Sequence, residues 1–357
     1  MQGIDFPLSK TKQESGRKFN LNDPRDRQRY FSSKVGAEIE KLKKYLASGK
    51  TFVGYLLGKK NSGKGTYSKL FMEALGTDRV GHVAVGDIVR DVHSGLADPA
   101  TKKELSDFLS KNYRGFHSLE EIEQVIEGRS QSTLVPTELI LALLKFEISK
   151  RPRQALFIDG FPRGLDQIGY SLYLKELLGY RDDPDFFVFI SLPNTVLDER
   201  IKYRVICPIC KTPRSTKLLA TSGAGYDEAA RKFYLICDNP PCNKARMVPK
   251  EGDELGIEPI RARLETDDQI FRKLLELQGV PKVYLRNAVP SAEAKEYVDD
   301  YELTPAYGYE LDQATKNVKI LESPWVVEDD DGIPSYSLLP PAVVVSLIRQ
   351  VVHVLKL

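Results

Sequence analysis

The stretch Gly58-Lys59-Lys60-Asn61-Ser62-Gly63-Lys64-Gly65-Thr66 follows a short apolar run and precedes a helical pattern that opens at Tyr67. Glycines let backbone N–H groups converge on phosphate oxygens, and the N-terminus of the following helix adds a partial positive charge. In such a loop Lys64 reaches the β- and γ-phosphates of a nucleotide, and the Thr66 hydroxyl joins the shell of Mg²⁺. The stretch therefore predicts a phosphate loop, with Gly65 standing where Ser or Thr usually follows the lysine.

Short apolar runs alternate with long amphipathic segments on both sides of this loop. The runs, rich in aromatic and branched residues, are Thr51–Leu57, Ala155–Ile158 and Phe186–Leu192, with a shorter fourth at Val80–Val85. Between these runs, apolar residues recur at the spacing of a helix, as in Thr137–Lys150. The alternation predicts an α/β fold with a doubly wound parallel sheet, whose ligands bind at the carboxyl ends of the strands.

The first 33 residues are polar and irregular, and their basic residues outnumber the acidic ones. We expect a solvated extension there, and a basic arm that binds nucleic acid is the alternative. Apolar spacing of three and four predicts a helix over residues 34–48. A last helix over Pro341–Leu357 is apolar enough to dock on the sheet.

Four more segments resemble the adenylate kinase family in the right order. They are Val83–Arg90, Leu134–Leu139, the run Ile158-Asp159-Gly160-Phe161-Pro162-Arg163 followed by Gln167, and the pair Arg200 and Arg204. With the Lys-Gly-Thr end of the loop, the resemblance covers residues 51–264 and is weak over most of 265–340.

The resemblance implies a nucleoside monophosphate kinase, in which permanent cations stabilise the transferred phosphoryl group. It gives catalytic roles to Lys64, Arg163, Arg200, Arg204 and Arg263. The implied ATP-binding residues are Gly58, Asn61, Ser62, Gly63, Lys64, Gly65, Thr66, Arg200 and Arg204. The implied AMP-binding residues are Val85, Gly86, Arg90, Leu134, Val135, Gly160, Arg163, Gln167, Lys250 and Arg263. Asp159 is expected to act on Mg²⁺ through the water shell of the ion.

The chain departs from the family pattern at several of these positions. Lys60 and Asn61 stand where the family commonly has Pro and Gly, although Asn tolerates left-handed backbone angles. Val85 replaces a Thr or Ser that often contacts the base, and Lys250 replaces an arginine of the lid. Arg261 competes with Arg263 for the position at the base of the lid.

Four cysteines fall in two close pairs, Cys207 with Cys210 and Cys237 with Cys242. The spacing suits a tetrahedral zinc site with four thiolates. The family resemblance implies that this zinc lies in the lid and is structural. A ribbon that binds nucleic acid is the rival interpretation, because basic residues surround the pairs. The acidic turn at Glu328-Asp329-Asp330-Asp331 lacks the ligand spacing of an EF-hand, and we expect a solvated turn.

The composition is that of a globular protein, with 357 residues, 41% apolar and 29% charged, and a formal net charge of +2. Near-neutral charge argues against a protein that coats nucleic acid. The apolar run Ala342–Ile348 is too short to cross a bilayer, and the N-terminus has no secretory pattern. We therefore expect a cytoplasmic monomer that does not bind membranes.

The predicted architecture is a P-loop core with two mobile insertions. Residues 1–50 form an N-terminal extension with one helix, and residues 51–357 form the kinase core. The core carries a monophosphate-binding insertion at 86–133 and a zinc lid at 205–260. The expected reaction converts Mg-ATP and AMP into two ADP, reversibly. The alternatives are a kinase for CMP or UMP, and a non-catalytic ATP sensor whose zinc ribbon binds RNA or a partner.

Overall fold

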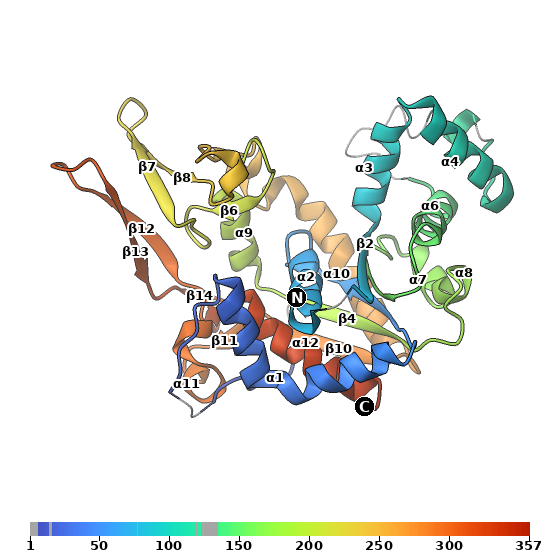
Figure 1. The fold of residues 1–357 in the computed structure, drawn as a ribbon, viewed down its shortest axis with the longest axis horizontal. Helices are drawn as coiled ribbons and strands as arrows, with labels where there is room; N and C mark the ends of the chain where they lie inside the picture. The colour runs from blue at the N-terminus through green and yellow to red at the C-terminus, as the bar shows by residue number, and fades with distance from the viewer. Residues whose placement is uncertain (1–5, 14–15, 77, 119, 123, 125–134) are drawn as a thin grey trace.

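The computed structural model describes the chain except residues 1–5, 14–15, 77, 119, 123 and 125–134. Its centre is a five-stranded parallel sheet with the order β10-β4-β1-β3-β2 (Figure 1). The strands are β1 (Val53–Leu57), β2 (Val80–Ala84), β3 (Ala155–Asp159), β4 (Asp185–Ser191) and β10 (Lys282–Arg286). The predicted parallel sheet is confirmed. Its edge strand β10 was not predicted, because only Val283 and Leu285 of its residues are buried and no continuous apolar run marks it.

Helices cover both faces of the sheet, because successive side chains of a strand point to opposite faces. On β1, Val53, Tyr55 and Leu57 pack with α3 (Val85–Gly95), α6 (Thr137–Ser149) and α10 (Arg261–Glu276). Phe52 and Leu56 pack with α1 (Pro24–Ala47), α2 (Lys64–Leu75) and α12 (Pro340–Val354). Burial on both faces explains why these strands read as unbroken apolar runs.

The N-terminal region is more ordered and more buried than the sequence pattern predicts. Helix α1 begins at Pro24 rather than near residue 34, and the Asp23 side chain caps it by accepting from the backbone N–H of Asp26. Phe6, Thr11 and Phe19 are buried, and the Thr11 hydroxyl donates to Glu302 Oε2 over 2.6 Å. The prediction of a solvated extension is therefore wrong for these residues.

The two predicted insertions leave the carboxyl edge of the sheet and stand apart from each other (Figure 1). The first contains α3 and α4 (Pro99–Asn112), followed by α6. The second begins at α9 (Asn194–Lys202) and contains the short strands β5 (Arg204–Ile206), β6 (Pro213–Ser215), β7 (Gly223–Asp227), β8 (Lys232–Ile236) and β9 (Val248–Pro249). The turns η2 (Asp253–Leu255) and η3 (Glu258–Ile260) lead from it into α10.

A third insertion, residues 287–338, lies between β10 and α12, in the part of the chain over which the family resemblance is weak. It contains β11 (Ala288–Pro290), α11 (Ala294–Tyr297), η4 (Asp300–Glu302), β12 (Ala306–Leu311), β13 (Val318–Ser323), β14 (Val326–Glu328) and β15 (Pro334–Ser337). The β12–β13 hairpin runs beside the β7–β8 hairpin of the second insertion (Figure 1). The Tyr309 ring stacks on that of Phe233, with ring centroids 5.6 Å apart.

The longest described helix, α1, is not apolar, and the apolar helix α12 is shorter. Helix α1 has 24 residues but is rich in charged side chains, whereas the apolar α12 has 15 residues. Among the described residues, no helix combines the length and the apolar character needed to cross a membrane.

Candidate active site

The phosphate loop joins β1 to α2 with the backbone geometry that the motif requires. Asn61 has φ 66° and Gly63 has φ 102°, both in the left-handed region that glycine and asparagine tolerate best. The Lys64 ammonium donates to the carbonyl oxygens of Gly58 at 2.8 Å and Lys59 at 3.0 Å. The loop therefore forms with Asn61 in place of the usual glycine, as the sequence predicts.

Asp159 ends β3 beside this lysine. Its carboxylate lies 3.8 Å from Lys64 Nζ and 3.8 Å from His82 Nε2. Burial raises the pKa of the Asp159 carboxyl, but the neighbouring His82, Lys64 and Arg163 outweigh it and hold this pKa below the ordinary value. Burial lowers the pKa of Lys64, and the charges of Asp159 and Asp267 oppose that effect. The site thus keeps Asp159 ionised at neutral pH.

Arg163 and Arg263 line one small pocket together with Lys64, Gly58 and Gly160. Gly160 has φ 86°, and a Cβ there would lie 3.0 Å from Arg163 Nε, so only glycine lets this guanidinium pack over the turn. The competing Arg261 side chain is 59% exposed and pairs with Glu258. The geometry therefore favours Arg263 over Arg261 at the base of the lid.

Arg200 and Arg204 line a wider cleft of about 480 Å³ on the other side of the loop. Arg204 donates to both carboxylate oxygens of Asp253, at 2.6 and 2.7 Å, and to Asn61 Oδ1 at 3.2 Å. Arg200 donates to Asn287 Oδ1 at 3.3 Å. The remaining wall of the cleft contains Thr66, Asp159, Leu218, Leu219, Thr304, Leu339 and Pro340. The cleft thus places the phosphate loop and two arginines beside apolar side chains.

The residues predicted for the monophosphate gather around the start of α3 and the turn after β3. A Cβ on Gly86 would lie 3.5 Å from the Arg90 guanidinium and 3.8 Å from that of Arg163, so both guanidinium groups lie beside this glycine. Arg90 pairs with Asp87 and its side chain is 68% exposed. Val85 and Val135 are buried. Leu134 lies outside the described residues.

Gln167, predicted to bind the base, is buried and already bonded within the protein. Its Oε1 accepts from the backbone N–H of Arg163 at 2.8 Å, and its Nε2 donates to Thr137 Oγ1 at 3.1 Å. A primary amide has two donor hydrogens and two acceptor lone pairs, so one of each remains for a ligand. Gln167 therefore also holds the turn that carries Arg163.

Comparison with known proteins agrees with this arrangement. The chain is 32% identical over 248 residues to an adenylate kinase of Solanum tuberosum, covering 65% of this chain and 74% of that protein. The chain belongs to the adenylate kinase family. An adenylate kinase of Thermotoga petrophila is 31% identical over 156 residues, which cover 43% of this chain and 59% of that protein. An adenylate kinase of Hydrogenobaculum is 28% identical over 184 residues, covering 52% and 70%. No protein-family model matches the chain.

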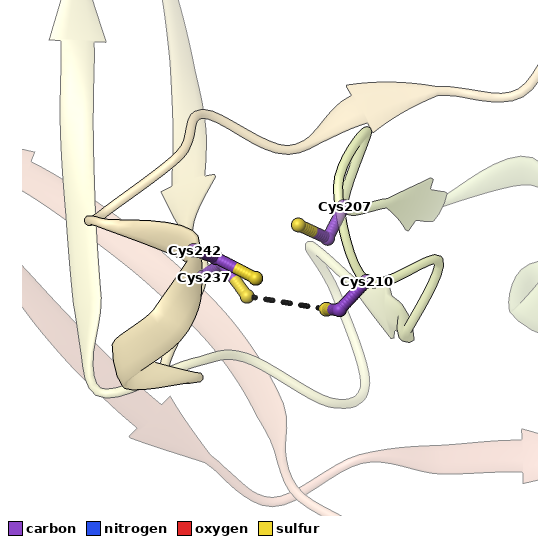
Figure 2. A group of neighbouring side chains, drawn as sticks. All are labelled: Cys207, Cys210, Cys237 and Cys242. Carbon is purple, nitrogen blue, oxygen red and sulfur yellow. Dashed lines mark hydrogen bonds between the residues drawn. The ribbon is translucent and has the colours of Figure 1, made fainter.

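The second insertion, which is the predicted lid, brings the four cysteines together (Figure 2). Their sulfur atoms all lie within 4.8 Å of one another, and the Sγ atoms of Cys210 and Cys237 are 3.7 Å apart. Tetrahedral coordination with metal–sulfur bonds of about 2.3 Å requires sulfur separations of about 3.8 Å. Hydrogen bonds with Thr212 lower the pKa of the Cys210 thiol to about 5, whereas burial raises the pKa of the neighbouring Cys242 thiol. The cluster is therefore suited to one metal ion.

Two polar residues of this site, Asp267 and Lys60, were not among the predicted site residues. Asp267 faces Lys64, Arg163 and Arg263, and burial raises the pKa of its carboxyl despite those cations. Burial lowers the pKa of Lys60, and the charges of Arg263, Lys250 and Arg204 lower it further, so Lys250 contributes to the same positive field. The spacing of Asp267 four residues after Arg263 on one helix was the available signal.

The acidic turn at residues 328–331 was predicted to be solvated, and this is wrong for Asp330. Its side chain is 14% exposed, and its Oδ1 accepts from the backbone N–H of Asn194 at 2.7 Å. No local pattern predicts this contact, because Asp330 and Asn194 are 136 positions apart in the chain.

Proposed function

We propose that this protein is an adenylate kinase, which transfers a phosphoryl group from Mg-ATP to AMP and yields two ADP, reversibly. The observation that carries the proposal is the pocket in which Lys64, Arg163 and Arg263 meet at the carboxyl edge of the sheet. This pocket shares Lys64 with the wide cleft, and its Arg163 lies near Gly86 of the predicted monophosphate residues. Several relatives named adenylate kinase support the reaction class.

In the proposed reaction the protein positions two nucleotides and stabilises charge on the phosphoryl group in transit. Lys64 contacts the β- and γ-phosphates, and Arg163 and Arg263 stabilise the equatorial oxygens from the acceptor side. Arg200 and Arg204 hold the donor phosphates, since guanidinium groups stay charged and bind phosphate with two parallel donors. Closure of the lid excludes water, so that ATP is not hydrolysed.

Mg²⁺ fits the residues that face the wide cleft. The Thr66 hydroxyl and the Asp159 carboxylate both line it, and both offer the oxygen ligands that Mg²⁺ prefers. The lowered pKa of Asp159 keeps the carboxylate ionised for this purpose. When bound, the ion neutralises charge on the β- and γ-phosphates. Thr66 would hold it directly, and Asp159 would hold it through water.

The cysteine cluster is proposed to hold structural zinc. Four sulfur ligands complete a tetrahedral site and leave no position for substrate, so the metal would fold the lid rather than take part in the reaction. Three of the cysteines are buried, which agrees with a structural role. A ribbon that binds RNA or a partner is the alternative role for the same segment.

One coupled assay tests the reaction and its acceptor. The full chain is incubated with Mg-ATP and, in parallel, AMP, CMP, UMP or GMP, and nucleoside diphosphate formation is followed. We expect the highest kcat/KM with AMP. A higher kcat/KM with CMP or UMP would replace the adenylate assignment by another monophosphate kinase. ATP binding without transfer to any monophosphate would instead support the non-catalytic sensor.

A further inference from the structure

The side chain of Lys59 leaves the phosphate loop and enters a buried polar pocket. Lys59 is 2% exposed, and its ammonium donates to Asn194 Oδ1 at 2.7 Å. The same ammonium lies 3.5 Å from Asp268 Oδ1 and 3.9 Å from Asp330 Oδ2. A buried ammonium requires partners of this kind, because its transfer out of water is costly. The Lys59 side chain thus anchors the loop to α9, to α10 and to the third insertion.

Asp330 reaches this pocket from the third insertion. While its Oδ2 faces Lys59, its Oδ1 accepts from the backbone N–H of Asn194, the first residue of α9. A carboxylate is favoured at this end of a helix by the partial positive charge of the exposed N–H groups. Beside it, the Thr195 hydroxyl donates to the carbonyl oxygen of Glu328 at 2.7 Å. One carboxylate therefore joins the insertion to both the phosphate loop and α9.

Both elements that Asp330 joins carry cations of the proposed ATP site. The carbonyl oxygen of Lys59 accepts from Lys64 Nζ, so movement of Lys59 moves the position of the Lys64 ammonium. Helix α9 carries Arg200 and leads to Arg204, whose guanidinium returns to Asn61 of the loop. The distance between the loop and these arginines is set in part by the Asp330 carboxylate.

We infer that Asp330 is a positioning residue for the phosphates of ATP, acting through Lys59 and the N-terminus of α9. The role belongs to the third insertion, over which the chain showed little resemblance to the family. The inference rests on the proposed function only in taking the wide cleft as the ATP site. It does not depend on the acceptor or on turnover.

The test compares Asp330→Asn with Glu293→Gln, which removes the same charge from an exposed position of the same insertion. Isothermal titration calorimetry with Mg-ATP gives the Kd, and the coupled assay gives KM for ATP and for AMP. For Asp330→Asn we expect Kd and KM for ATP to rise about tenfold, the effect of one hydrogen bond to a charged group. KM for AMP should stay within about twofold of wild type, and Glu293→Gln should match wild type throughout.

Lys59→Met supplies an independent probe from the loop side, and it should weaken ATP binding by about the same factor. The double variant should be little weaker than either single variant, because both remove one linkage. An unchanged Kd for ATP in folded Asp330→Asn or Lys59→Met, or an equal rise in both KM values, would overturn the inference. Since calorimetry measures binding alone, a wild type that binds ATP without turnover refutes the proposed reaction and leaves this test valid.

Discussion

The predicted lid, residues 205–260, and the predicted monophosphate clamp, the helices α3 and α4, are attached to the core in different ways. The clamp packs on α6, with Leu105 and Leu109 buried and the Phe108 ring 5.0 Å from that of Phe146. The lid continues from α9 and is also contacted by the β12–β13 hairpin of the third insertion. The sequence predicted two similar mobile insertions, whereas the structure gives the lid a second support.

The second support of the lid consists of stacked, hydrogen-bonded and charged contacts. The Tyr309 ring stacks on Phe233, and its hydroxyl donates to the carbonyl oxygen of Thr216 at 2.5 Å. The backbone N–H of Tyr307 donates to the carbonyl oxygen of Lys217 at 2.7 Å, and Lys316 pairs with Glu228 at 3.0 Å. Because a moving lid must carry this hairpin with it or break these contacts, we expect lid opening to be more restricted than clamp opening.

The largest effect on kcat is expected from Lys64 and Arg163, which lie between the predicted lid and the predicted clamp in the proposed reaction. Lys64→Ala and Arg163→Ala should each lower kcat at least about a hundredfold, since one lost donor in a dry site costs about 3 kcal/mol. Both the lid and the clamp should keep their amide exchange rates, because neither variant alters their packing. Near-wild-type turnover in either folded variant would contradict the catalytic assignment.

Removing the proposed zinc should destabilise the lid and leave the clamp unchanged. Protein purified without chelator should contain about one zinc per chain, and Cys237→Ser should lose it together with the order of the lid. Hydrogen exchange should then become faster in residues 205–260 and in the β12–β13 hairpin, while α3, α4 and the sheet stay protected. Elemental analysis without zinc would refute the site, and global unfolding on chelation would show that the lid is not an independent unit.

The sequence predicted the parts of the fold that depend on local pattern. The unbroken apolar runs of β1, β3 and β4 and the Gly-rich loop were visible because burial on two faces and phosphate binding each restrict the residue types allowed. The short strands of the third insertion were not visible, since their residues are mostly half-buried or exposed and bear no apolar period.

Contacts between distant segments were also beyond the reach of sequence patterns. Lys59 is charged and belongs to a loop, so nothing local indicates that Asp268 and Asp330 bury it. Thr11 and Phe19 lie in a polar segment, yet Tyr301 and Glu302 contact them from the other end of the chain. Phe6 is buried in the same way against Phe271 and Tyr284. The motif residues could be placed in one site only through the family resemblance.

The support of the lid by Tyr309 gives the next smaller prediction. Tyr309→Ala should weaken the contact between the hairpins by about 1 kcal/mol, the usual value of a stacked aromatic pair, which is roughly fivefold in the opening equilibrium. Amide exchange in β7 and β8 should accelerate by that factor, while α3 and α4 keep wild-type rates. Tyr309→Phe keeps the ring and loses the hydrogen bond to Thr216, so its amide exchange rates in β7 and β8 should lie between those of wild type and Tyr309→Ala. Equal acceleration in both insertions would remove the proposed asymmetry.

An effect of similar size is expected for the choice of the acceptor base. Val85 is buried at the start of α3, where it offers no hydrogen bond, so Val85→Thr should increase the preference for AMP over CMP by about 1 kcal/mol. Gln167→Ala should reduce that preference and also lower kcat for every monophosphate, because the Gln167 amide supports the backbone of Arg163. The ratio of kcat/KM for AMP to that for CMP measures base selection, whereas a loss of kcat for every monophosphate reports the support of Arg163. A ratio unchanged in both variants would mean that neither side chain faces the base, and that the clamp selects the acceptor by shape alone.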